Sequence, residues 1–299
     1  VRPPPGPYEL GRLGCDLDRQ ERQLGGRSGE IGRGERGHVT GRYPCPPTRP
    51  RLPEEPIASA AMVESGGFPR CVLAVFAHPD DAELACGGAL AGWAAAGASV
   101  TIVCGCRGDK GAAERVEPGA LAALREAEGR AAAAQLGAEW HALGMPDGEI
   151  AVDRLRAEVV ALVRRRRPDV VVAPDPTVVI VGSSHVNHRD HREVGWAVLD
   201  AVGAEAANPN YHPGDDPAFQ AAELWLCASS SPDRWVDIEV SLDAKVAALR
   251  CHATQLGGGS ELGAADPFLR ELVVGRAAAE GRAGGVRFGE AFRRIVLVD

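Results

Sequence analysis

The sequence has no long apolar run and no excess of positive charge, and both absences exclude function classes. No run reaches the roughly 18 apolar residues of a membrane span, because the best one, residues 170–181, is broken by Pro174, Asp175 and Pro176. The N-terminus also lacks the apolar core of a secretory signal. The formal net charge of -8 argues against nucleic-acid binding, whose affinity comes mainly from Lys and Arg that neutralise phosphates.

Paired cysteines are also missing. The eight cysteines are scattered and do not show the C-x-x-C spacing of a structural zinc site. Several lie inside apolar runs, as in Cys71-Val72-Leu73, where a free Cys behaves as a small hydrophobic residue. We therefore expect a protein of a reducing compartment, the cytoplasm.

The first part of the chain differs from the rest. Residues 1–67 are rich in Pro, Gly and Arg, as in Pro3-Pro4-Pro5, and contain no periodic apolar segment. Ordering such a segment costs entropy with little burial in return. We expect residues 1–67 to form a disordered N-terminal extension and residues 68–299 to form the folded domain. Because Met62 precedes the first good strand, we interpret it as the true start.

From Cys71 onward, short apolar strands alternate with helical segments. This alternation is typical of an α/β fold with a mainly parallel sheet and helices on both faces. The pattern predicts strands at 71–77, 99–106, 139–143, 169–173, 223–227 and 295–298, and helices at about 82–96, 120–136, 153–167, 190–202, 242–255 and 267–280.

Polar clusters follow three of these strands. They read His78-Pro79-Asp80-Asp81 after the first strand, Arg107-Gly108-Asp109 after the second, and His188-Arg189-Asp190-His191 beyond the strand at 169–173. In open parallel sheets, sites form outside the carboxyl ends of the strands. We therefore expect the three clusters to converge on one edge of the sheet.

The residue types in these clusters suit a catalytic metal. A catalytic zinc needs about three His or carboxylate ligands and an open position for water. His78 and Asp81 lie three residues apart at the mouth of a helix, and His191 would complete the set. Asp80 stands beside a ligand and could take the proton of the water as general base.

Two more residues of the third cluster, His188-Arg189-Asp190-His191, have candidate roles. His188, one turn before His191, could stabilise the oxyanion or protonate the leaving amine. Asp190 could hold an imidazole in the right tautomer. Taken alone, the first cluster is equally compatible with a turn and helix cap. For His188 and His191 alone, solvated polar residues at a helix start are the better explanation. The combination of the two clusters after two strands favours a metal site.

The two clusters also resemble known motifs. The segment A-V-F-A-H-P-D-D-A-E-L-A-C-G-G at 74–88 resembles the signature of the PIG-L/LmbE-like N-acetylglucosaminyl deacetylases, and H-R-D-H at 188–191 resembles their second metal motif. The resemblance extends over about 71–294. It implies a Rossmann-like three-layer fold. It also implies Zn²⁺, with Fe²⁺ as an alternative, held by the residues that do so in the motifs: His78, Asp81 and His191, with Asp80 as general base and His188 assisting the intermediate.

The resemblance further implies a small-molecule substrate. Arg107, Asp109, Arg125 and Asp147 are similar to positions that line the sugar pocket of the family. The expected reaction is hydrolysis of the acetamide of an N-acetylglucosamine-like compound. Arg189 stands where the second motif commonly reads Pro, which affects loop shape and therefore substrate choice.

Other functions stay open at this point. One alternative is an amidase acting on a thiol conjugate of an amino-sugar cofactor, which would use the same site. Another is a non-catalytic zinc- or nucleotide-binding Rossmann-like protein, but the turn after the first strand lacks the G-x-G-x-x-G pattern of nucleotide binding. The roles of Tyr211, His212 and His252, and whether the chain forms a homo-oligomer, are not determined by the sequence.

Overall fold

The computed structural model describes residues 68–112, 115–181, 185–255 and 267–298. The predicted N-terminal extension over 1–67, with Met62, lies outside the described residues. Within the described part, no helix combines the length and the apolar character needed to cross a membrane.

A seven-stranded sheet forms the middle layer, with the strand order β3-β2-β1-β4-β7-β9-β8. The first five strands in this order run parallel, and β9 is antiparallel to both of its neighbours. The predicted α/β fold with a mainly parallel sheet is therefore confirmed. The strands are β1 Cys71–Phe76, β2 Ser99–Cys106, β3 Glu139–Met145, β4 Val170–Pro174, β7 Glu223–Cys227, β8 Arg234–Asp237 and β9 Gly289–Val296.

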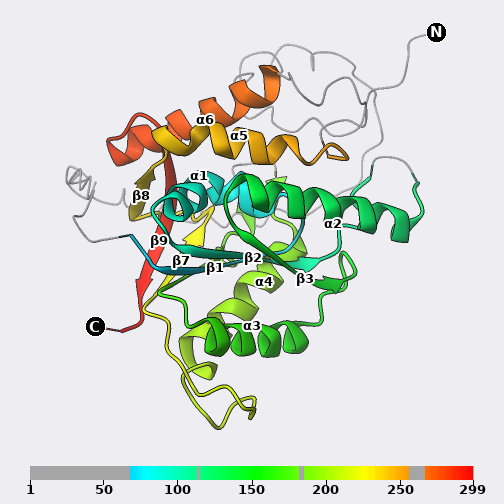
Figure 1. Cartoon of the computed structure of the whole chain (residues 1–299), viewed down its shortest axis with the longest axis vertical. Coiled ribbons are helices and arrows are strands. Elements are labelled where there is room, and N and C mark those ends of the chain that lie inside the picture. The colour runs from blue at the N-terminus through cyan, green and yellow to red at the C-terminus, as the bar shows by residue number, and fades with distance from the viewer. Residues whose placement is uncertain (1–67, 113–114, 182–184, 256–266, 299) are drawn as a thin grey trace, which may run out of the picture. The chain divides into compact units, whose positions relative to one another are not determined.

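Helices cover both faces of this sheet (Figure 1). One face carries α1 Asp81–Ala95, α2 Pro118–Gln135, α5 Leu242–Arg250 and α6 Pro267–Gly284, and the other carries α3 Val152–Arg166 and α4 Arg189–Asp200. Alternate residues of β1 separate the two cores: Val72 packs in the α1 layer, whereas Leu73 packs in the α3 and α4 layer. A strand covered on both faces must be apolar throughout, which explains the continuous apolar run of β1.

The strand order reverses at β1, which lies between β2 and β4. Val72 pairs with Val100 on one side and with Val170 on the other, both in parallel register. Right-handed crossovers in opposite directions place the connecting helices on opposite faces. The loops that follow β1 and β4 therefore diverge and leave a crevice at their carboxyl ends, where ligands bind in such sheets.

The C-terminal third departs from the predicted boundaries. α5 ends at Arg250 rather than 255, because the next backbone N–H groups, of Cys251 and His252, bond three residues back instead of four. β9 begins at Gly289 rather than 295, since charged residues interrupt the apolar pattern of a strand whose antiparallel pairing needs only one apolar face. β8 and a short hairpin, β5 Ile180–Val181 with β6 His185–Val186, were not predicted.

Candidate metal centre and active site

The loop between β1 and α1 has a strained backbone. Asp80 precedes the first residue of α1 with φ 108°, a left-handed conformation that non-glycine residues rarely adopt. Two hydrogen bonds hold the loop: the backbone N–H of His78 donates to Asp81 Oδ2 at 2.8 Å, and that of Leu84 donates to the carbonyl of Asp80 at 3.0 Å. The left-handed conformation of Asp80 is therefore part of the tight turn that places His78, Asp80 and Asp81 at the end of β1.

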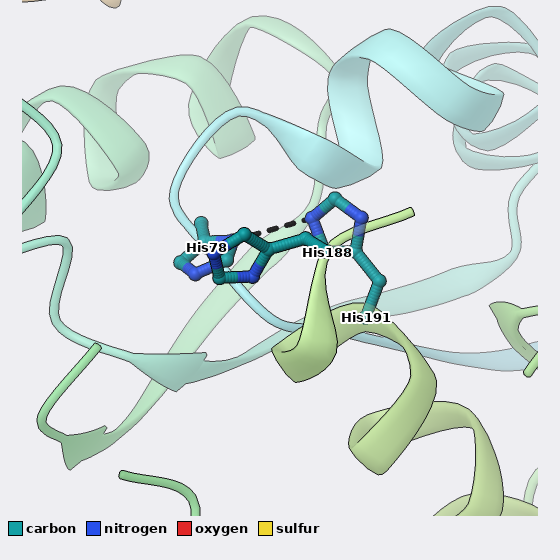
Figure 2. A group of neighbouring side chains, drawn as sticks. All are labelled: His78, His188 and His191. Atoms are coloured by element: carbon teal, nitrogen blue, oxygen red, sulfur yellow. Dashed lines mark hydrogen bonds between the residues drawn. The ribbon is translucent and has the colours of Figure 1, made fainter. Parts of the chain in front are cut away.

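His191, on the first turn of α4, meets this loop. Its Nε2 lies 3.3 Å from His78 Nδ1 and 3.2 Å from Asp81 Oδ1, and His78 Nδ1 lies 3.4 Å from Asp81 Oδ2. Figure 2 shows His78 and His191 with these two ring nitrogens facing each other, and His188 beside them. Donor groups from two segments that are far apart in the sequence thus converge on one point.

The hydrogen bonds around the two imidazoles fix their tautomers. His78 Nε2 lies 3.1 Å from Asp190 Oδ2, a carboxylate oxygen that can only accept, so Nε2 carries the hydrogen and Nδ1 a lone pair. His191 Nδ1 lies 3.2 Å from Asn187 Oδ1, whose amide is oriented by its own bond to the Val178 carbonyl. His191 Nδ1 therefore donates, and its Nε2 also carries a lone pair.

The lone pairs of His78 Nδ1 and His191 Nε2 and the carboxylate of Asp81 face one another and would repel without a cation between them. Burial opposes protonation of His78, but its hydrogen bonds to Asp190 and Asp81 prevail and raise the pKa of His78 to about 12. Burial would raise the pKa of Asp81, but the charge of His191 and the bonds to both histidines hold it well below its usual value. Without a metal, a proton on His78 thus supplies the positive charge that faces Asp81.

The geometry fits a small metal ion. Ligand atoms about 2.0–2.1 Å from a tetrahedral ion lie about 3.3 Å from one another. The two ring nitrogens lie 3.3 Å apart, and each lies 3.2–3.4 Å from one of the two carboxylate oxygens of Asp81. His78, His188 and His191 form another set whose ring nitrogens lie within 4.8 Å of one another. His78, Cys106 and Asp190 form a third. In the set of His78, Asp81 and His191, the lone pairs of both imidazoles already point inward.

His188 is the N-cap residue of α4, and its ring lies beside the rings of His78 and His191. Its Nδ1 accepts the backbone N–H of Asp190 at 3.2 Å, so the ring hydrogen of the neutral form is on Nε2. The ring stands edge-on to His78 at 5.0 Å between centroids, and 52% of its side chain is exposed. Partial burial and the charge of His78 lower the pKa of His188. The Nε2–H of the neutral ring thus has no hydrogen-bond partner among the residues that the structure describes and is available as a donor at the mouth of the site.

Asp80 lies beside the same group with a perturbed acidity. Burial, then the neighbouring charge of Asp81, raise the pKa of Asp80 to about 7, against the opposing charge of Arg125. Arg125 is nearly fully buried and holds the loop from beneath, donating to the carbonyls of Pro79 at 2.7 Å and Gly108 at 3.3 Å. Its guanidinium is 3.5 Å from Asp80 Oδ2.

The other predicted pocket residues lie on the loops after β2 and β3. Asp109 and Asp147 are buried and tie the loops together, since Asp109 Oδ1 accepts the N–H of Asp147 and Asp147 Oδ1 accepts that of Gly108. Arg107 is half-exposed and bonds Asp109 at 3.1 Å, so it is the one of the three able to reach a ligand directly. Contact of these residues with substrate stays a prediction.

Sequence reasoning did not single out a buried acid and base behind the site. Glu83, on the first turn of α1, and His252, just beyond α5, are buried 3.7 Å apart. Their side-chain oxygens and nitrogens have no hydrogen-bond partner among the described residues. His252 was left open by the sequence, and only the fold reveals that it meets α1. Tyr211 and His212 lie elsewhere, where their carbonyls accept from Arg164.

Comparison with known proteins identifies the chain. Residues 73–202 match the family model for PIG-L, the GlcNAc-PI de-N-acetylases. The chain is 31% identical over 229 residues to the diacetylchitobiose deacetylase of Thermococcus kodakarensis, covering 73% of this chain and 82% of that one. It belongs to the PIG-L family of deacetylases. The predicted family and the predicted amide-hydrolysing activity are thereby confirmed.

Two further matches agree. The N,N'-diacetylchitobiose deacetylase of Pyrococcus horikoshii shares the fold with a TM-score of 0.66 and 29% identity, covering 76% of this chain and 84% of that one. The 1D-myo-inositol 2-acetamido-2-deoxy-alpha-D-glucopyranoside deacetylase of Geodermatophilus obscurus is 33% identical over 188 residues, covering 53% of this chain and 61% of that one. The PIG-L match includes all three polar clusters, which counts against the non-catalytic alternatives.

Proposed function

We propose that the protein is a zinc-dependent N-deacetylase that hydrolyses the acetamide of an N-acetylglucosamine-like small molecule or conjugate. The observation that carries the proposal is the convergence of the donor atoms of His78, Asp81 and His191, 3.2–3.4 Å apart with lone pairs facing inward. The similar proteins named for diacetylchitobiose and for an acetamido-glucopyranoside support the substrate class, because both compounds are N-acetylated amino sugars.

A zinc ion held by these three residues would lower the pKa of a bound water to about 7 and polarise the amide carbonyl. Fe²⁺ suits the same ligand types, so metal analysis is part of the test. Asp190 and Asn187 are the residues that keep the two imidazoles in the ligating tautomers.

The chain supplies the proton transfers. Asp80, with a pKa of about 7, is partly ionised at neutral pH and accepts the proton of the attacking water. Because Nδ1 of His188 accepts from the backbone of Asp190, its N–H at Nε2 is available to donate to the oxyanion that develops on the carbonyl. When the C–N bond breaks, Asp80 returns its proton to the departing nitrogen. The products are acetate and the free amine.

The substrate pocket and the setting of the protein are also proposals. Arg107 would bind sugar hydroxyls directly, while Arg125, Asp109 and Asp147 would shape the loops around them. A reducing compartment such as the cytoplasm fits the unpaired state of the six cysteines in the described residues.

The experiment is a substrate panel with zinc-loaded protein. We expect free amine and acetate from N-acetylglucosamine, N,N'-diacetylchitobiose or the acetamido-glucosyl inositol. We expect Asp80→Asn to retain zinc and lose about 10²- to 10⁴-fold in kcat. Asp153→Asn, at a side chain that is 92% exposed on α3, is the matched control. No acetate from any acetylated sugar, or cleavage of only an amino-sugar thiol conjugate, would overturn the proposal.

A further inference from the structure

Helix α1 is broken one turn after the candidate metal ligand. Cys86 has φ -145° and ψ 20°, outside the helical region. In a regular helix the N–H of Gly88 would donate to the carbonyl of Leu84, four residues earlier. Here the N–H of Gly88 donates instead to Glu290 Oε1 at 2.9 Å, and the carbonyl of Leu84 accepts from Lys245 Nζ at 3.0 Å.

A buried ion pair from two other elements therefore occupies the break. Lys245, on α5, and Glu290, on β9, are 2.5 Å apart, with 5% and 2% of their side chains exposed. Glu290 Oε2 also accepts the N–H of Ala89 at 2.7 Å. The pair thus satisfies the backbone groups on both sides of the break, which would otherwise be unpaired in the core.

Two glycines follow the break. A Cβ on Gly88 would lie 2.8 Å from the side chain of Ile238, so this position packs too closely for a larger residue, whereas one on Gly87 would make ordinary contact with Lys245 Cγ at 3.4 Å. Burying two charges costs several kcal/mol per ion before their attraction and hydrogen bonds repay it, and an unbroken α1 would need neither charge. The break, rather than the packing of the core, is therefore the feature that these residues serve.

The pair is linked to the site through one turn of helix. Lys245 binds the carbonyl of Leu84, and the N–H of Leu84 donates to the carbonyl of Asp80 at 3.0 Å. The turn between these two bonds carries Asp81. We propose that Lys245 and Glu290 are positioning residues that hold this first turn apart from the rest of α1, so that Asp81 and Asp80 keep their places at the metal centre. The inference rests on the proposed function of that centre.

The test compares three variants of the full chain. Glu290→Gln preserves the shape but cannot accept from both Gly88 and Ala89, and Lys245→Met removes the donor to Leu84 at similar length. Arg164→Met is the matched control, because Arg164 is an equally buried cation that donates to backbone carbonyls but holds the segment after α4. Folding is checked by circular dichroism, and zinc affinity is measured by chelator competition with zinc alone.

We expect both Glu290→Gln and Lys245→Met to weaken zinc binding at least about 10-fold, the usual size of an outer-shell effect, and Arg164→Met to leave it unchanged. We also expect kcat to fall while KM stays within about threefold, because the loops after β2 and β3 are untouched. A merely structural pair would lower the melting temperature and leave zinc affinity and kcat as in the wild type, which would overturn the inference.

Hydrogen exchange of the metal-free wild type keeps the test decisive if a variant fails to fold. The amides of Gly88 and Ala89 should be strongly protected through their bonds to Glu290. Rapid exchange at both would contradict the inference. Failure of the proposed function would look different, since the wild type would then bind zinc but release no acetate, while the effects of the variants on zinc affinity would stand.

Discussion

Replacing Asp190 tests how the proposed metal ligand His78 is held in its ligating tautomer. Asp190 Oδ2 holds the hydrogen on His78 Nε2 at 3.1 Å and also accepts the N–H of Gly148 at 2.7 Å. In Asp190→Ala, the hydrogen bond that holds the hydrogen on His78 Nε2 is lost, so the ring is no longer fixed with the lone pair of Nδ1 toward the metal site. Loss of such an outer-shell partner costs about 10- to 100-fold in metal affinity, or about 1.4–2.7 kcal/mol.

Asp190→Asn gives a sharper comparison than alanine alone. The amide oxygen can replace Oδ2, and the amide nitrogen then falls at Oδ1, which has no hydrogen-bond partner among the described residues. The tautomer of His78 is preserved and only the charge is lost, so we expect zinc affinity to fall no more than about 10-fold. Asp190→Ala also leaves the N–H of Gly148 without its acceptor, which should lower the folding stability by about 1–3 kcal/mol.

The assay is chelator competition for zinc on wild type, Asp190→Asn and Asp190→Ala, with thermal unfolding as a parallel measurement. The predicted order of zinc affinity is wild type, then Asn, then Ala. Equal affinity in all three proteins would refute the reasoning, because it would mean that the His78 tautomer does not depend on Asp190. A loss as large in Asn as in Ala would show that charge, rather than tautomer, is the contribution of Asp190.

Three further predictions follow from the same geometry. His191→Ala should purify without zinc, whereas His188→Ala should keep it and lose about 10²- to 10³-fold in kcat, as metal analysis and kinetics can check; equal zinc loss in both would count against this division of roles. The pKa of His78 is raised from 6.5 to about 12, so its protonation stabilises the metal-free protein fully below pH 6.5 and progressively less toward pH 12. Because zinc must displace this proton, zinc affinity should rise between pH 6 and 8. A zinc affinity that does not change over this pH range would contradict the prediction. Gly108→Ala should lower the melting temperature, because φ is +72° and the new Cβ would lie 2.6 Å from Arg125; an unchanged midpoint would contradict it.

The sequence predicts the parts of this protein that depend on local pattern. Continuous apolar runs predict strands covered on both faces, which β1 and β4 are. The polar residues in the connections after these strands predict where a site forms, since the order of a parallel sheet brings such connections together. His78 and His191 are 113 residues apart, yet their ring nitrogens lie 3.3 Å from each other.

The parts that escaped prediction depend on contacts between distant elements. A helical pattern through Cys86 gives no sign of the break in α1, because the groups that compensate for it, Lys245 and Glu290, come from α5 and β9. The orienting role of Asn187 needs the hairpin next to it, whose Val178 carbonyl fixes the amide. Likewise, the proximity of Glu83 and His252 is set by the packing of α5 on α1.

The most direct measurement is anomalous diffraction at the zinc edge on crystals of the zinc-loaded protein. The account predicts one anomalous peak about 2.0–2.2 Å from His78 Nδ1, His191 Nε2 and a carboxylate oxygen of Asp81. A peak beside Cys106 and Asp190 instead, or no peak between His78 and His191, would contradict it.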